Sequence, residues 1–293
     1  MNAPQPKQAP IIDKRLLNLV FLCSLLVGIC NGCVKPQPAT VTTVPTSNTS
    51  GSTSPVSDLT EVPQVPEGTT TNPADVPKFK PAPEGKVLRH AVFFSFKEES
   101  SEEDIQGVVD AFRELPEKIA EISDFKWGVN NSPEELNDGF THCFLLTFKN
   151  EADRAAYIPH EAHKAFGDVL RPHKDKVFVL DYWGDANAKP LKRELKHAVF
   201  LRFKWDASLE DIQKVEAAFA ALPAKIDTIR RFEWGINNSP ERHAAGFTHC
   251  FMVGFGSEEG RATYLPHPDH LAFIEILKPV LDAPRVLDFW AEE

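Results

Sequence analysis

Cysteine and basic charge are scarce in this sequence. Only five of the 293 residues are cysteines, and the one C-x-x-C pair, Cys30 and Cys33, ends an apolar run with no histidine motif beside it. A structural disulfide framework is therefore not expected. The formal net charge of −10 leaves no basic face, which argues against nucleic-acid binding. A close-spaced ligand motif such as H-E-x-x-H is also missing, so the sequence predicts neither a metal nor a cofactor.

The longest apolar run is short as well. It extends from Leu16 to Ile29, below the roughly 20 apolar residues that a membrane span needs. Basic residues precede it and Gly32-Cys33 follows it, which is typical of a secretory signal and resembles the bacterial lipoprotein type. Residues 1–33 are thus predicted to direct export, with an acylated Cys33 holding the protein on a membrane. Secretion after cleavage and an uncleaved signal anchor are the alternatives, and each places the protein outside the cytoplasm.

Residues 34–86 contain little that could form a core. They are rich in Pro, Ser and Thr and show neither helical nor strand periodicity. Such a segment cannot bury enough apolar surface to offset the entropy that ordering removes. Its many prolines favour extended conformers, so we expect a disordered linker between the membrane and the folded part.

The rest of the chain contains one domain twice. Residues 88–183 and 195–290 align without a gap at a constant offset of 107, and about half of the positions are identical. A tandem duplication of this kind predicts two equivalent domains, 87–184 and 195–293, joined by a connector at 185–194.

Each copy has the pattern of an α+β domain. Alternating apolar residues predict four strands in the first copy, at 90–97, 125–129, 140–148 and 177–183. Helical spacing predicts helices at 101–122, with a kink at Pro116, and at 151–157 and 160–170. In the third strand, Phe140 and His142 are expected to share a face. The order βαββαβ predicts two ferredoxin-like domains.

A ferredoxin-like sheet carries helices on one face and leaves the other face open. The second copy can cover the open face of the first within the same chain. We therefore expect an intramolecular dimeric α+β barrel, in which the two repeats are each other's partner and the chain is a monomer.

Both copies bring histidines and a tyrosine to one end of a strand-plus-helix unit. Gly-Phe-Thr-His is followed by Tyr-x5-His in each, and strand alternation lets further His and Asp side chains point into an apolar pocket beneath the helices. The candidates are His90, His142, Tyr157, His163 and Asp181 in the first copy, and His197, His249, Tyr264, His270 and Asp288 in the second.

These motifs resemble the stress-responsive A/B barrel domain (Dabb) family, together with His-Ala-Val-Phe in the first strand and an aspartate in the last. The resemblance implies a barrel between two such domains. In a plant polyketide cyclase of that family, a tyrosine and a histidine with this spacing close a linear polyketide by an aldol reaction without a metal or organic cofactor. The resemblance therefore implies catalytic roles for Tyr157, His163, Tyr264 and His270. It implies supporting, ligand-binding roles for His90, His142, Asp181, His197, His249 and Asp288.

Three functions remain open on the sequence. A His-Tyr-Asp network can satisfy its own hydrogen bonds and act only as a structural module. It can form the rim of a pocket that binds a small apolar or aromatic molecule. It can also catalyse acid–base chemistry, because histidine can remove a proton beside a carbonyl while tyrosine donates to the developing oxyanion. We expect a small ligand in each repeat, with a cyclase- or lyase-type enzyme as the alternative.

Overall fold

The computed structural model describes residue 79 and residues 81–189 and 191–292, all within the compact unit Phe79–Glu293. The predicted signal segment with Cys33, and linker residues 34–78, lie outside the described residues. Over the ranges that are described, no helix is both long and apolar enough to cross a membrane.

The first repeat forms a four-stranded antiparallel sheet in the order β2-β3-β1-β4. Its elements are β1 (Lys86–Phe96), α2 (Glu102–Arg113), α3 (Leu115–Lys118), β2 (Asp124–Val129), β3 (His142–Phe148), α4 (Glu151–Tyr157), α5 (Glu161–Leu170) and β4 (Lys174–Asp185). This is the predicted ferredoxin-like arrangement.

The second repeat has the same order, with its sheet arranged as β6-β7-β5-β8. Its elements are β5 (Leu195–Phe203), α6 (Leu209–Ala220), the short 3-10 helix η2 (Leu222–Ala224), β6 (Ile229–Ile236), β7 (His249–Phe255), α7 (Glu258–Tyr264), α8 (Pro268–Leu277) and β8 (Leu281–Trp290). The α+β class and the tandem ferredoxin-like domains are confirmed.

Two details of the predicted elements are wrong. The long kinked helix is instead two helices, because α2 ends at Arg113 and Pro116 lies in the first turn of the separate α3. Proline lacks an N–H and fits a first turn better than a helix interior. The third strand begins at His142, and Phe140 packs between the sheets rather than beneath the helices. Gly139, with φ of +82°, redirects the chain just before it.

Local side-chain bonds set the helix starts. Ser101 caps α2 and exchanges hydrogen bonds with Asp104 in a capping box. In α5 and α8 the cap is a histidine, His160 or His267, whose Nδ1 accepts an N–H from the first turn. These two histidines therefore begin the helices that carry the Tyr-x5-His histidines.

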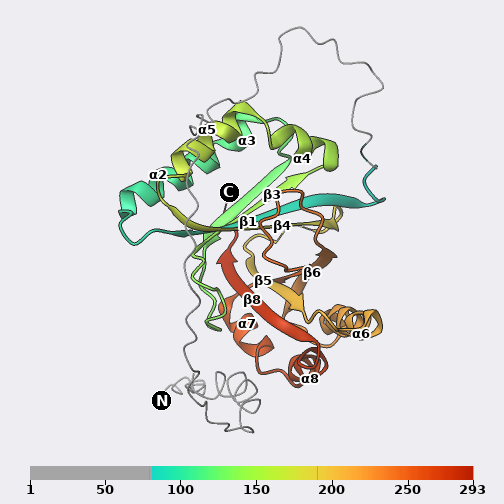
Figure 1. Cartoon of the computed structure of the whole chain (residues 1–293). Coiled ribbons are helices and arrows are strands. Elements are labelled where there is room, and N and C mark those ends of the chain that lie inside the picture. The colour runs from blue at the N-terminus through green and yellow to red at the C-terminus, as the bar shows by residue number, and fades with distance from the viewer. Residues whose placement is uncertain (1–78, 80, 190, 293) are drawn as a thin grey trace, which may run out of the picture. The chain divides into compact units, whose positions relative to one another are not determined.

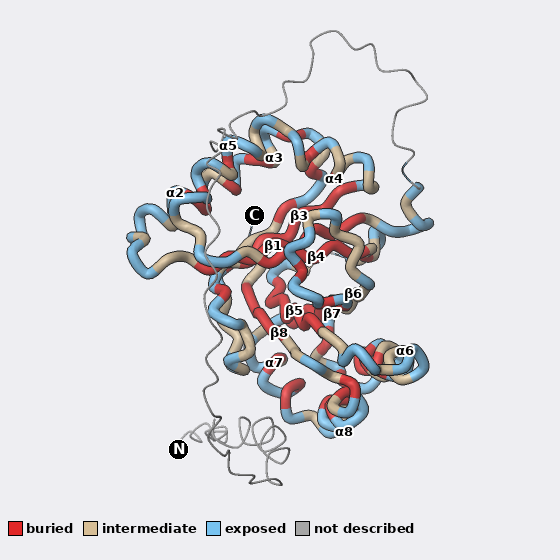
Figure 2. The backbone as a smooth tube through the Cα atoms, viewed as in Figure 1, coloured by how far each residue is buried: buried red, intermediate tan, exposed pale blue. Residues whose placement is uncertain are grey.

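The two sheets pack face to face, and each carries its helices on the outer side (Figure 1). Side chains alternate along each strand, so Ala91 and Phe93 of β1 point toward the second sheet while Val92 and Phe94 point toward the helices. The inner layer includes Phe200 of the second repeat and forms one buried cluster from both repeats. The buried residues accordingly concentrate in the strands (Figure 2).

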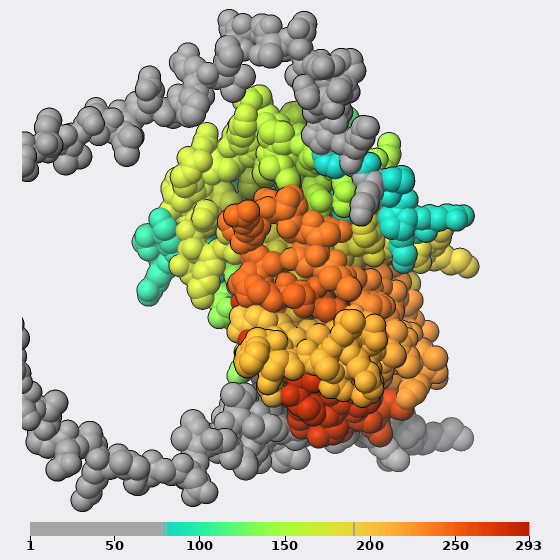
Figure 3. Space-filling view, turned by 45° about the vertical axis from the view of Figure 1, so that its right-hand side comes forward, coloured from blue at the N-terminus to red at the C-terminus, as the bar shows by residue number. Residues whose placement is uncertain are grey.

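The sheets also meet at their edges. The Trp127 N–H on β2 donates to the Glu292 oxygen, and the Glu292 N–H donates back. Gly128 lies at this seam, where a Cβ would stand 2.5 Å from a backbone oxygen of β8. At the opposite seam a Cβ on Gly235 would stand 2.8 Å from the Tyr182 Cβ. The two repeats thus pack into the expected intramolecular barrel, and their surfaces are in direct contact (Figure 3).

Candidate functional site

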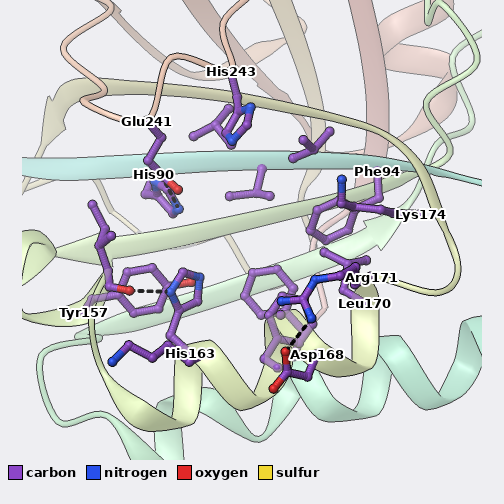
Figure 4. Close-up of a pocket in the computed structure, with 18 residues that line it drawn as sticks. His90, Phe94, Tyr157, His163, Asp168, Leu170, Arg171, Lys174, Glu241 and His243 are labelled. Atoms are coloured by element: carbon purple, nitrogen blue, oxygen red, sulfur yellow. Dashed lines mark hydrogen bonds and ion pairs between the residues drawn. The ribbon is translucent and has the colours of Figure 1, made fainter. Parts of the chain in front are cut away.

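A cavity of about 550 Å³ lies between the first sheet and the helices that cover it (Figure 4). Its apolar wall includes Val92 and Phe94 of β1, Phe112 of α2, Phe166 of α5 and Val179 of β4. Small-molecule sites typically have volumes of about 300–1,000 Å³ and walls of this kind. The cavity is therefore large enough for a small organic ligand.

His90 lines this cavity and is paired with buried Asp181 on the neighbouring strand. The β1–β4 register places them opposite each other, with Nδ1 of His90 2.7 Å from Oδ1 of Asp181. The other carboxylate oxygen accepts a hydrogen bond from Arg154 at 2.7 Å. Burial alone would lower the pKa of His90, but the charge and hydrogen bond of Asp181 outweigh burial and raise it. The pairing favours an imidazolium whose Nδ1–H donates to Asp181.

Tyr157 and His163 lie against each other beside His90. Tyr157 ends α4, His163 is in the first turn of α5, and their ring centroids are 4.3 Å apart. The His163 Nδ1 lies 2.9 Å from the Ile158 oxygen, so Nδ1 carries the donated proton and Nε2 keeps a lone pair. Burial lowers the pKa of His163 and raises the pKa of Tyr157 well above its ordinary value. At neutral pH this pair is a neutral imidazole beside a neutral phenol.

The second repeat contributes to this site through the loop between β6 and β7. The backbone N–H of Asn238 donates to the backbone oxygen of Asp181 at 2.9 Å, and the side-chain oxygen of Asn238 accepts a hydrogen bond from Arg154 at 2.8 Å. Farther along the loop, Glu241 and His243 line the cavity on the side opposite α5 (Figure 4). The first cavity is therefore built by both repeats.

The second repeat contains the same cluster on its own sheet. His197 Nδ1 lies 2.7 Å from Asp288 Oδ1, and Arg261 donates to the other carboxylate oxygen at 2.7 Å. The rings of Tyr264 and His270 are 4.2 Å apart, and His270 Nδ1 donates to a backbone oxygen at 2.9 Å. Burial lowers the pKa of His270 to about 4.

The equivalent loop of the first repeat, between β2 and β3, contacts the cluster of the second repeat. The backbone N–H of Asn131 donates to the backbone oxygen of Asp288 at 2.8 Å, and the side-chain oxygen of Asn131 accepts a hydrogen bond from Arg261 at 2.9 Å. Glu134 places Oε2 3.8 Å from His197 Nδ1. Burial raises the pKa of this carboxyl to about 7, although the neighbouring His197 acts in the opposite direction. Each repeat thus completes the cluster of the other.

The two repeats were expected to carry equivalent pockets, yet several residues that line the first cavity are not repeated in the second copy. Gly167 lies on the wall of the first cavity, and an added Cβ would meet nothing within 4 Å. The second repeat has Ile274 at this position, only 8% exposed, so a side chain takes up space that the glycine leaves open. At three further lining positions the first cavity has a lysine or histidine where the equivalent position of the other repeat has a leucine. The pairs are Lys164 with Leu271, Lys174 with Leu281, and His243 with Leu136.

Residues 88–184 and 195–291 each match the family model of the stress responsive A/B barrel domain. The chain belongs to this family. The stress-response A/B barrel domain-containing protein HS1 of Arabidopsis thaliana is 36% identical over 95 residues, covering 32% of this chain and 87% of that protein. Olivetolic acid cyclase of Cannabis sativa is 30% identical over 96 residues, covering 33% of this chain and 95% of the cyclase. Among solved structures, an anthrone oxidase-like protein with 10% identity has a TM-score of 0.50, covering 74% and 95% of the two chains, which reflects the shared fold.

Two candidates taken from the resemblance to the A/B barrel family lie away from the cluster. His142 contacts the Phe96 ring, hydrogen-bonds to Thr141 and is not among the residues that line the cavity. Its counterpart His249 places Nε2 2.9 Å from a carboxylate oxygen of Glu216 on α6. The cluster that the structure brings together is thus His90, Asp181, Tyr157 and His163, with its equivalents in the second repeat.

The sequence patterns miss the buried arginines and the loops exchanged between the two A/B barrel domains. Both features are nevertheless repeated in the sequence, because each copy contains Asn-Asn-Ser-Pro-Glu and an arginine three residues before the tyrosine of Tyr-x5-His. The five-residue motif is typical of a turn, and a turn motif does not indicate which surface it will contact. Arg154 and Arg261 lie on helices and give no sequence sign of being buried.

The described residues contain neither a candidate metal-binding group nor an activated cysteine. In the part of the chain that the structure describes, no group of three or more His, Cys, Asp or Glu side chains could hold a metal ion. Cys143 and Cys250 are buried, and burial raises their pKa well above the ordinary value, so neither is an activated thiolate.

Proposed function

We propose that the first repeat binds one small apolar or aromatic molecule in the cavity between its sheet and helices. The observation that carries the proposal is the open volume beside Gly167, whose wall combines aromatic and aliphatic side chains with polar ones. Protein interiors are otherwise close-packed. The second repeat has a buried isoleucine, Ile274, at the same position, so the fold itself does not require a glycine there.

In this proposal the second repeat forms part of the wall of the first cavity and does not bind a ligand of its own. Its loop supplies Glu241 and His243 to the first cavity, and Asn238 to the hydrogen bonds of Arg154. We therefore expect one bound molecule per chain.

Titration of the intact chain with the neutral fluorescent probe N-phenyl-1-naphthylamine tests the site. We expect saturable binding to one site, strong loss in Gly167→Ile, and no change in Val169→Ile, which alters an exposed position of the same helix. The reciprocal change Ile274→Gly is expected to add a second site. Unchanged binding in Gly167→Ile would leave a purely structural role for the domain.

Acid–base catalysis of the cyclase or lyase type is a second candidate function. It is favoured by the separation of the pKa values, which leaves His163 a free base while Tyr157 and His90 keep protons to donate. In such a step Nε2 of His163 takes a proton from the carbon next to a carbonyl. The electron pair moves to the carbonyl oxygen, which accepts a hydrogen bond from the Tyr157 hydroxyl or from the His90 imidazolium.

Deuterium exchange at the methyl group of acetophenone in D₂O, followed by proton NMR, tests this second function. The wild-type chain is expected to accelerate exchange, and His163→Ala to abolish the acceleration. His270→Ala is the matched control, because it removes the equivalent histidine from the second repeat. If the chain binds N-phenyl-1-naphthylamine but does not accelerate deuterium exchange, the cavity serves binding and not acid–base catalysis.

We also propose that the chain is exported and tethered to a membrane through Cys33. The support is the sequence of residues 1–33, in which basic residues, a short apolar run and Gly32-Cys33 follow one another. Metabolic labelling with a radiolabelled fatty acid is expected to label the wild-type chain and not Cys33→Ser. An unlabelled wild-type chain would contradict acylation.

A further inference from the structure

The cavity of the first repeat has a basic end that the proposed binding function leaves unexplained. Arg171 and Lys174 lie at the end away from Tyr157 and His163 (Figure 4). Arg171 follows α5 and Lys174 begins β4, so the two basic groups come from both sides of one tight turn. The cavity thus has an acid–base cluster at one end and cationic groups at the other.

Lys174 differs from the other basic residues of the lining in having no counter-charge. Arg171 is paired with Asp168 at 2.8 Å, and Lys164 with Glu161 at 2.9 Å, both at exposed positions. Lys174 is half-buried, and its ammonium makes no hydrogen bond or ion pair with any described residue. A lysine that is partly shielded from water attracts an anion more strongly than a fully exposed one, since solvent screens its charge less.

The second repeat provides an internal comparison. Where the first cavity has Lys174, the second repeat has Leu281, and this change accompanies the filling of the space by Ile274. Lys164 and His243 likewise correspond to leucines. Gly167 and the side chains of Lys164, Lys174 and His243 therefore occur together in the first repeat, and all four have apolar counterparts in the second. Arg171 keeps a basic counterpart, Lys278. The shared change is expected if the glycine and these side chains serve the same ligand.

We propose that the ligand of the first repeat is an elongated organic acid whose anionic group lies at Lys174 and whose apolar body extends toward the cluster of His90 and Tyr157. This inference rests on the proposed binding function and specifies the class of its ligand. The carboxylates that face the cavity do not oppose it. Asp168 is neutralised by Arg171, and Glu241 lies at the other end, with Oε2 3.7 Å from His90 Nε2.

Two probes that differ only in one anionic group test the inference on the intact chain. 8-Anilinonaphthalene-1-sulfonate carries a sulfonate, and N-phenyl-1-naphthylamine is the same skeleton without it. We expect the sulfonate probe to bind the wild-type chain about tenfold more tightly, the effect of one hydrogen bond to a charged group. Lys174→Leu, which copies the second repeat, is expected to remove this preference, so that the two probes bind with similar affinity.

Control variants separate the possible failures. Lys278→Leu removes the same charge from the second repeat, at the counterpart of Arg171, and is expected to keep the preference. Equal affinity of both probes in the wild type, with both lost in Gly167→Ile, would overturn the anion inference while the binding function stands. Insensitivity of both probes to Gly167→Ile and to the milder Gly167→Ala would overturn the binding function as well. If Lys278→Leu and Lys174→Leu had equal effects, the preference for the sulfonate probe would be due to the overall charge of the protein, and the inference would be overturned.

Discussion

Replacing Glu134 with glutamine is expected to stabilise the protein at alkaline pH and to have little effect in acid. Glu134 extends from the first repeat into the cluster of the second, where its side chain is 13% exposed. Its Oε2 has no hydrogen-bond partner among the described residues. Burial raises the pKa of this carboxyl from an ordinary 4.5 to about 7, against the opposing effects of His197 and Arg261.

The sign follows from proton linkage. The folded chain holds the Glu134 proton more tightly than the unfolded chain does, so the unfolded chain ionises first as the pH rises. The stability associated with this group is therefore complete below about pH 4.5 and is lost as the pH rises toward 7. The separation of the two pKa values corresponds to about 3 kcal/mol. Glutamine has nearly the same shape and cannot ionise, so it removes this loss.

Urea unfolding followed by tryptophan fluorescence measures the effect at pH 5 and pH 8. We expect Glu134→Gln to raise the free energy of unfolding by about 3 kcal/mol at pH 8 and by less than about 1 kcal/mol at pH 5. Glu99→Gln, at an exposed position, controls for the loss of one negative charge. The reasoning is refuted if Glu134→Gln destabilises at pH 8, or stabilises equally at both pH values.

Four further substitutions test other parts of the fold. The pKa of His270 is lowered to about 4 by burial, so wild-type stability is expected to fall as the pH drops from 6.5 to 4, and His270→Gln to remove about 3 kcal/mol of that fall in urea unfolding. Asp181→Asn is expected to cost about 3–5 kcal/mol in the same assay, because buried Arg154 loses its counter-charge. Gly128→Ala is expected to lower stability by about 1–3 kcal/mol, since its Cβ would clash at the seam. Gly107→Ala, in open space on α2, is expected to raise the midpoint of thermal unfolding. A lower midpoint for Gly107→Ala, or an unchanged one for Gly128→Ala, would contradict the packing of these positions.

The fold was largely predictable because its information is local and repeated. Apolar alternation locates the strands, and the duplication supplies a partner for each open sheet face. The errors arise where a single residue changes the local geometry. Pro116 starts a new helix instead of kinking the old one, and the left-handed Gly139 places Phe140 on the opposite side of the sheet from the predicted face.

The candidate site was predictable only in part, because much of it depends on contacts between the repeats. Strand register brings His90 and Asp181 together, and both positions follow from alternation. The loop that carries Asn238 and Glu241 lies far from them in sequence and contacts them only after the two sheets pack. The difference between Gly167 and Ile274 is visible in the sequence, yet its meaning depends on which helix face lines the cavity.

The asymmetry between the repeats is a consequence of their fusion into one chain. In a symmetric dimer every substitution appears in both sites, so a closed site and an open site cannot coexist. In this chain, residues 237–243 serve the first cavity and residues 130–136 serve the second cluster, and each loop can change alone. His243 lines the first cavity, whereas the equivalent Leu136 belongs to the loop that contacts the second cluster. Duplication therefore allows the two repeats to diverge although each still donates a loop to the other, and the proposed stoichiometry of one ligand per chain depends on that divergence.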